Sequence, residues 1–126
     1  MEGNSSDLVA FLLAMQDTVR LYHWQTRQHA RHVATCQFLG ELSSLVDRLV
    51  EAYLGRYERP DFGGELVLRL PTELTESKAT EQLQAYGRWL KLEFPKLVRP
   101  HDTDLLNVRD EALGALHQAL YRFTLH

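Results

Sequence analysis

The sequence is short of cysteine, long apolar runs and clustered positive charge, and each shortage excludes something. Cys36 is the single cysteine, so an internal disulfide is impossible and a reducing, cytoplasmic compartment is the simplest expectation. The longest apolar run, residues 8–15, is far too short for a membrane span, and the first seven residues lack the positive region of a signal peptide. The net charge of -3 and the absence of a basic tail argue against nucleic acid and membranes as partners.

The motifs of several enzyme classes are missing as well. The sequence contains no glycine-rich phosphate loop, no nucleophile elbow and no Cys-x-x-Cys pair. It also lacks Glu-x-x-His, the motif that holds two irons inside a single four-helix bundle. This last absence argues against a pair of metal ions within one subunit.

What the sequence does contain is four segments with apolar residues at helical spacing. They span residues 7–25, 28–57, 76–94 and 104–123. Prolines and glycines gather in residues 58–72, which predicts a longer connection between the second and third helices. A chain of 126 residues that is 44% hydrophobic is large enough for one core. We therefore predict an all-α, four-helix bundle that forms a single domain over residues 1–126.

The second segment has a wider apolar surface than one core requires. Its main stripe consists of Val33, Cys36, Leu39, Leu42, Val46, Leu49 and Tyr53. Phe38 and Leu45 lie in a neighbouring strip, which we expect to face another helix or another subunit. We expect Cys36 to be buried, because it lies on the stripe and shows no sign of activation. Trp24, at the end of the first helix, is expected to fill space in the core.

Four residues suggest a metal site. Asp47 and Glu51 are four residues apart and share a helix face, and His32 precedes Asp47 by fifteen residues, about 22 Å along a helix. One metal cannot reach both ends of that helix within one subunit, but two antiparallel copies bring the histidine of one to the carboxylates of the other. The tight turn after His23 allows it to approach His32. Nitrogen and carboxylate ligands suit iron, zinc or manganese.

The same residues have a simpler interpretation, which stays open at this point. The two carboxylates can be solvated, with Arg48 and Arg56 nearby for ion pairing. The two histidines can be residues at the end of the bundle that bind backbone carbonyls. Under this interpretation the chain is a non-enzymatic structural or interaction protein that keeps the bundle without a metal site.

The run Tyr22-His23-Trp24, followed by His32 and Asp47-x-x-x-Glu51, resembles the ferroxidase signature of the Dps family of miniferritins. The resemblance implies a ferritin-like bundle in which His23, His32, Asp47 and Glu51 are both metal ligands and catalytic residues. In that family two subunits related by a two-fold axis share each site, and ferrous iron is oxidised there, commonly by hydrogen peroxide. The resemblance thus implies a homodimer within a larger assembly, with one iron or a di-iron pair bridged by Glu51.

The chain departs from that family in three ways. The spacing from His23 to His32 is three residues shorter than in Dps proteins, and Thr26-Arg27-Gln28 replaces a glycine-containing turn. The short helix that the family has between its second and third long helices is replaced by the connection rich in proline and glycine. The lysine-rich tail with which some members bind DNA is missing. These departures favour a dimer over the family's twelve-subunit shell.

A second resemblance concerns short ferritin-like proteins of large DNA viruses and phages. It rests on the sequence stretches 23–26, 30–32 and 107–111. This similarity implies the virion as an alternative location and a component of a viral particle as the non-enzymatic alternative.

Overall fold

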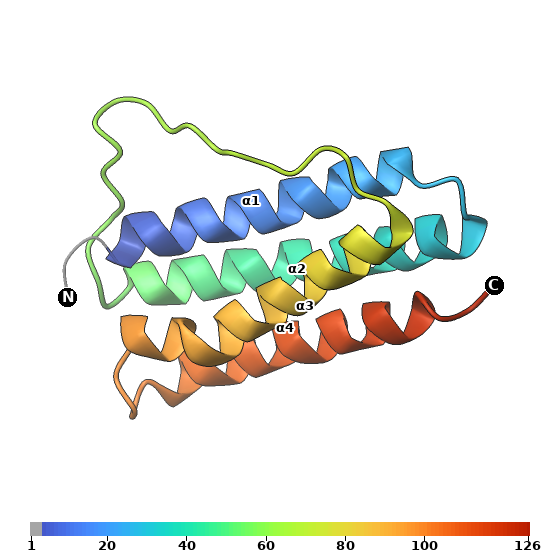
Figure 1. The fold of residues 1–126 in the computed structure, drawn as a ribbon. Coiled ribbons are helices and arrows are strands. Elements are labelled where there is room, and N and C mark those ends of the chain that lie inside the picture. The colour runs from blue at the N-terminus through green and yellow to red at the C-terminus, as the bar shows by residue number, and fades with distance from the viewer. Residues whose placement is uncertain (1–3) are drawn as a thin grey trace.

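The computed structural model describes residues 4–126, which form four α-helices and one short 3-10 helix (Figure 1). The elements are α1 (Asn4–Gln25), α2 (His29–Leu54), α3 (Glu76–Leu92), η1 (Phe94–Leu97) and α4 (Thr103–Arg122). Within these residues there is no β-strand. The predicted all-α, four-helix architecture is therefore confirmed.

The order of the helices in space follows from one long connection. A three-residue turn makes α1 and α2 antiparallel, whereas residues 55–75 run back along α1 to the other end of the bundle (Figure 1). As a result α3 starts beside the α1–α2 turn and runs parallel to α2, and α4 returns in the opposite direction. Gly63 and Gly64 have positive φ angles of 67° and 94°, a conformation that favours glycine, at the point where the connection reverses. The longer connection expected between the second and third helices is present.

Local chemistry explains where α3 begins and ends. The Thr75 side chain accepts a hydrogen bond from the backbone N–H of Lys78 at 3.2 Å and so caps the first turn. At the other end, Pro95 disfavours the α-helical conformation of the residue before it. The helix therefore ends at Leu92, two residues earlier than the sequence predicted, and the tighter turn η1 follows.

The core lies where α2 contacts both α1 and α4. Because α2 has a helix on each side, Phe38 (1% exposed) and Leu45 (9%) are buried inside the subunit, and their strip belongs to the subunit's own core. Val33 (39% exposed) and Cys36 lie outside this arc, on the outward face of α2. The expectation that Cys36 is a core residue is therefore wrong.

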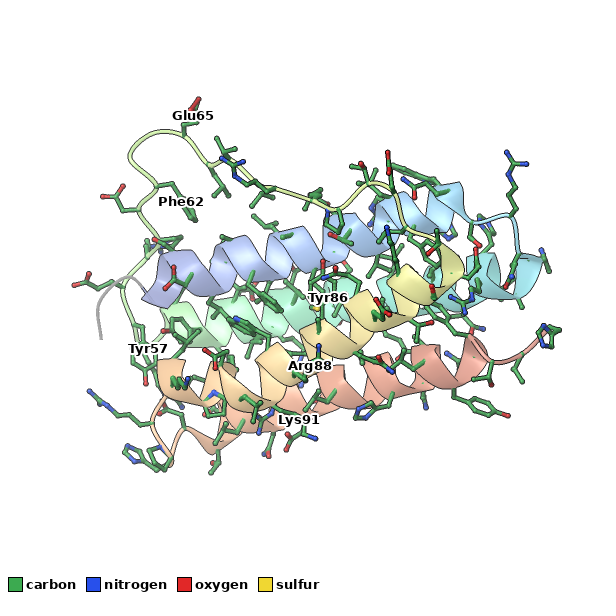
Figure 2. All side chains as sticks on the ribbon, viewed as in Figure 1. Tyr57, Phe62, Glu65, Tyr86, Arg88 and Lys91 are labelled. Carbon is green, nitrogen blue, oxygen red and sulfur yellow. The ribbon has the colours of Figure 1, made fainter. Side chains whose placement is uncertain are left out.

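Aromatic residues join α3 to α1. Phe11 stacks on Trp89 with ring centroids 3.7 Å apart and meets the edge of Tyr86 at 5.6 Å. Figure 2 shows Tyr86 on the same helix as Arg88 and Lys91. Tyr86 is buried, whereas Arg88 and Lys91 are exposed. None of the described helices combines the length and the apolarity that a membrane crossing requires.

Candidate metal centre

The turn between α1 and α2 brings His23 and His32 together. His23 lies in the last turn of α1 and His32 in the first turn of α2, and the N–H of Thr26 still bonds the carbonyl of Tyr22 at 2.9 Å. The two imidazole rings stack with their centroids 4.0 Å apart and their planes 16° from parallel. Two histidines nine residues apart thus form one pair, although the turn is shorter than a Dps turn.

Each histidine of this pair is held by the backbone of the other, so the expectation of the simpler interpretation, that both bind backbone carbonyls at the end of the bundle, is confirmed. The Nδ1 atom of His23 lies 3.0 Å from the carbonyl oxygen of His32, and Nδ1 of His32 lies 3.0 Å from the carbonyl oxygen of His23. A carbonyl oxygen can only accept, so each Nδ1 carries the hydrogen and donates it. In the neutral rings both Nε2 atoms then keep a lone pair, the form in which imidazole binds a metal.

The surroundings of His23 favour this neutral form. Burial lowers the pKa of His23 below its ordinary value, and the neighbouring His32 and Arg20 lower it further, because a second positive charge is unfavourable there. The backbone hydrogen bond to His32 opposes this effect without reversing it. His23 is therefore available as a neutral ligand at neutral pH.

Asp47 and Glu51 lie far from this pair, on the exposed outer face of α2. The helical rise places Asp47 about 22 Å from His32 along the helix axis. Among the residues that the structure describes, no three histidine, cysteine, aspartate or glutamate side chains converge on one point. Within the described subunit the two predicted pairs of ligands are thus kept apart.

The arginines that could neutralise the two carboxylates are engaged elsewhere. Arg48 pairs with Glu111 of α4 at 3.1 Å, and Arg56 pairs with Asp104 at 2.6 Å. Within the described chain, no side chain forms an ion pair or hydrogen bond with either Asp47 or Glu51. The two carboxylates are therefore exposed to solvent, as the simpler interpretation expected, but they do not pair with Arg48 or Arg56 within the described subunit.

The surface between the histidines and the carboxylates carries small side chains. Cys36, Gly40 and Ser43 follow one another along the exposed face of α2, with Gly40 near its middle. A Cβ atom built on Gly40 meets nothing within 4 Å, so the space outside this position is open. The outer face of α2 is thus accessible over its whole length.

Trp24, expected in the core, is instead 67% exposed beside His23, because at its helical position it faces away from α2 and α4. The expectation that Trp24 fills space in the core is therefore wrong.

Behind the histidine pair lies a polar cluster that the sequence did not predict. The buried guanidinium of Arg31 lies 3.1 Å from the Glu76 carboxylate and donates to the Glu76 carbonyl at 2.8 Å and the Tyr22 hydroxyl at 3.1 Å. It also lies 4.4 Å above the ring of Phe123. The cluster ties the end of α1 to the starts of α2 and α3, and so fixes the turn beside the histidines. No local spacing could reveal it, because Glu76 lies 45 residues from Arg31 and 54 residues from Tyr22 in the chain.

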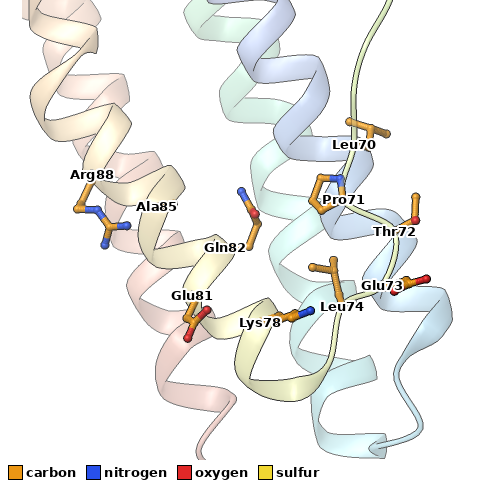
Figure 3. Close-up of a pocket in the computed structure, with 10 residues that line it drawn as sticks. All are labelled: Leu70, Pro71, Thr72, Glu73, Leu74, Lys78, Glu81, Gln82, Ala85 and Arg88. Atoms are coloured by element: carbon orange, nitrogen blue, oxygen red, sulfur yellow. The ribbon is translucent and has the colours of Figure 1, made fainter.

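A separate pocket of about 730 Å³ lies between the connection and α3 (Figure 3). Residues 70–74 form one wall, and Lys78, Glu81 and Arg88 of α3 are among the residues of the other. Both signs of charge line it, and none of the four predicted site residues does. The pocket is therefore not part of the candidate metal centre.

Comparison with known proteins adds a family but no activity. Residues 23–123 match a family described as a family of unknown function, DUF5856. This span begins at His23 and includes all four predicted site residues. No curated protein and no solved structure matches the chain.

Proposed function

The chain belongs to the DUF5856 family of unknown function, and we propose that it is a ferritin-like, Dps-type protein that binds ferrous iron between two subunits. The observation that carries the proposal is the histidine pair, in which both Nδ1 atoms lie 3.0 Å from a backbone carbonyl oxygen and both Nε2 atoms have no partner among the described residues. Bundle-end histidines without a ligand make the same carbonyl contacts, so the feature that the proposal uses is the pair of open Nε2 atoms. Metal-binding histidines commonly have this arrangement, because the second nitrogen fixes the ring.

The second half of the site comes from another copy of α2 in antiparallel orientation. The midpoint between His32 and the two carboxylates falls next to Gly40, where a missing side chain and open space allow two helices to approach closely. With the two-fold axis there, His32 of each copy lies opposite Asp47 and Glu51 of the other. The same pairing completes two equivalent sites per dimer.

Electrostatics favour the same pairing. No acidic residue lies in the first turn of α2 and no basic residue in its last, where each would be favourable. Instead Arg31 and His32 lie near the positive end of the helix dipole and Glu51 near the negative end. An antiparallel partner compensates the positive end, because it places the carboxylates of Asp47 and Glu51 beside it.

In the assembled site the four side chains have distinct roles. His23 and His32 would donate nitrogen lone pairs, and Asp47 and Glu51 of the other copy would supply negative charge and oxygen ligands, with Glu51 as the proposed bridge if two irons bind. This mixture of ligands suits ferrous iron, with zinc or manganese as alternatives. Iron held there loses an electron to peroxide or oxygen, so the carboxylates stabilise the more highly charged ferric product.

Anaerobic titration with ferrous iron tests the proposal, followed by addition of peroxide while ferric absorbance is recorded. We expect stoichiometric binding to the dimer. In His32→Ala the affinity should fall by about 100-fold or more, which exceeds the usual loss when a residue that only supports a metal ligand is removed. His117→Ala, an exposed histidine of α4, serves as the matched control and should bind as the wild type does. A dimer that binds no iron would contradict the proposal and favour a structural or interaction protein.

A further inference from the structure

Thr35 is a buried polar side chain in direct contact with the histidine pair. It is 0% exposed, on the side of α2 that faces the core. Its Oγ1 atom lies 2.9 Å from Nδ1 of His23. His23 therefore has two partners for one Nδ1 hydrogen, the hydroxyl of Thr35 and the carbonyl of His32.

The direction of this hydrogen bond follows from the other contacts of the hydroxyl. Thr35 Oγ1 lies 2.8 Å from the carbonyl oxygen of Arg31 and 3.1 Å from that of His32, and both of these atoms are acceptors. The single hydroxyl hydrogen is used for one of these carbonyls. The oxygen of Thr35 must then accept from His23, which again places the hydrogen on Nδ1.

We infer that Thr35 is a positioning residue that holds His23 with Nδ1 protonated and turned inward, so that Nε2 is presented to a divalent cation. This inference rests on the proposed function, because it assigns a purpose to the Nε2 lone pair. Among the residues that the structure describes, the carbonyl of His23 is the one Nδ1 partner of His32. Thr35 therefore acts on one of the two histidines, and the other is an internal reference.

The test compares two substitutions of Thr35 in the full-length protein. Thr35→Val keeps the shape and removes the hydroxyl, whereas Thr35→Ser keeps the hydroxyl. Nitrogen-15 NMR of the metal-free protein reads the tautomer of each histidine ring, and titration calorimetry with zinc, which is stable in air, reads affinity. Thr18→Val is the matched control, since Thr18 is also buried (1% exposed) on a helix of the bundle but bonds neither histidine among the described contacts.

Thr35→Val removes the shorter Nδ1 contact of His23, at 2.9 Å, and leaves the carbonyl of His32, which lies within the α2 helix, as the remaining acceptor. We therefore expect the Nε2–H tautomer of His23 to gain population relative to the wild type, His32 to stay unchanged, and zinc binding to weaken by about 10- to 100-fold. Thr35→Ser should restore both properties, and Thr18→Val should alter neither. If His23 keeps a single Nδ1–H tautomer in Thr35→Val, or if serine does not restore it, Thr35 is only a core residue and the inference is wrong.

The two readouts separate this inference from the proposed function. The tautomer is measured without metal, so it reports on Thr35 even in a protein that binds nothing. A tautomer change in Thr35→Val together with no metal binding by the wild type would overturn the proposed function and the ligand-presenting purpose, leaving Thr35 as an orienting residue alone. An unchanged tautomer with normal zinc binding by the wild type would overturn the role of Thr35 and leave the proposed function standing.

Discussion

The two ends of α2 hold their polar side chains in opposite ways. Where α2 ends and α4 begins, Asp102 is only 4% exposed and accepts hydrogen bonds from the Tyr57 hydroxyl and, at 2.9 Å, from the N–H of Arg99. Figure 2 shows Tyr57 at this end of the bundle. The guanidinium of Arg56 lies between Asp102, at 3.6 Å, and Asp104, at 2.6 Å. At the other end, the histidine pair leaves an Nε2 atom on each ring without a partner among the described residues.

The polar groups around Asp102 and those on the outer face of α2 are therefore suited to different roles. A buried polar group without a partner costs stability, so the groups around Asp102 bond one another and stabilise the contact between α2 and α4. The outer carboxylates and His32 are exposed and His23 is half-buried, and their polar atoms without a partner among the described residues are hydrated at little cost. Such groups contribute little to folding and remain free to bind a ligand. Substitutions around Asp102 should therefore change stability, and substitutions on the outer face of α2 should change binding.

The largest effect is expected from the outer carboxylates. Asp47→Asn combined with Glu51→Gln should lower iron affinity by about 100-fold or more, because both charged oxygen ligands are lost. The free energy of unfolding of the subunit should change by less than about 0.5 kcal/mol, since these side chains are exposed and form no hydrogen bond or ion pair within the described chain. Anaerobic iron titration and urea denaturation measure the two quantities.

At the end of the bundle where Asp102 lies, the corresponding substitution is Tyr53→Phe. The fully buried hydroxyl of Tyr53 donates to the carbonyl of Leu97 at 3.1 Å, so its removal should lower the free energy of unfolding by about 1–2 kcal/mol. Iron affinity should not change. If either substitution changed iron affinity and the free energy of unfolding together, the two ends of α2 would not act independently.

An intermediate effect is expected at Gly40, which should matter only between subunits. Gly40→Leu introduces a side chain where the subunit has open space, and helix propensity should stabilise the subunit by up to about 1 kcal/mol. The same side chain should obstruct a second α2 and weaken the dimer about 10- to 100-fold. Sedimentation or light scattering at several concentrations measures the dissociation constant.

Gly114→Leu on α4 is the control for this substitution. A Cβ atom at Gly114 also meets nothing within 4 Å, but Gly114 lies on a different helix from the proposed interface. Its dimer should remain intact. Equal association of Gly40→Leu and the wild type would mean that the copies do not meet through this face of α2.

The smallest effect is expected in how the free energy of unfolding depends on acid pH, and it concerns Asp102. The hydrogen bond from Tyr57 lowers the pKa of Asp102, and the Arg99 N–H and the Arg56 charge lower it further. A lowered pKa in the folded state stabilises the fold above the ordinary carboxyl pKa, and this contribution is lost as the pH falls from that value toward the folded-state pKa. Asp102→Asn should therefore show a shallower loss of stability on acidification. Thermal unfolding at several pH values measures it, and identical slopes would contradict it.

The sequence predicted the helices well because their signals are local. Apolar periodicity predicted a first helix over residues 7–25 and a fourth over 104–123, and the structure has Asn4–Gln25 and Thr103–Arg122. Errors occurred where a helix end depends on its surroundings. The second helix was predicted to reach Tyr57 but ends at Leu54, because Gly55 follows and Tyr57 turns to bond Asp102.

The candidate site was only half predictable. Spacing identified His23, His32, Asp47 and Glu51 and showed that one helix cannot join them, because helical rise fixes their separation. Spacing could not show that the histidines bond each other's carbonyls, which depends on the exact path of a three-residue turn. It also could not reveal the part of Thr35 in this contact, since a buried threonine on a helix has no distinctive pattern.

Residue spacing alone was enough to predict four amphipathic helices, a long connection after the second, and an outer row of imidazoles and carboxylates. Which strip of α2 is buried depends on the packing of the helices, because α1 lies on one side of α2 and α4 on the other. This is why Phe38 lies in the core and Cys36 does not. The same packing decided which polar groups are satisfied within the subunit and which remain open, since the partners that satisfy them lie far away in the chain.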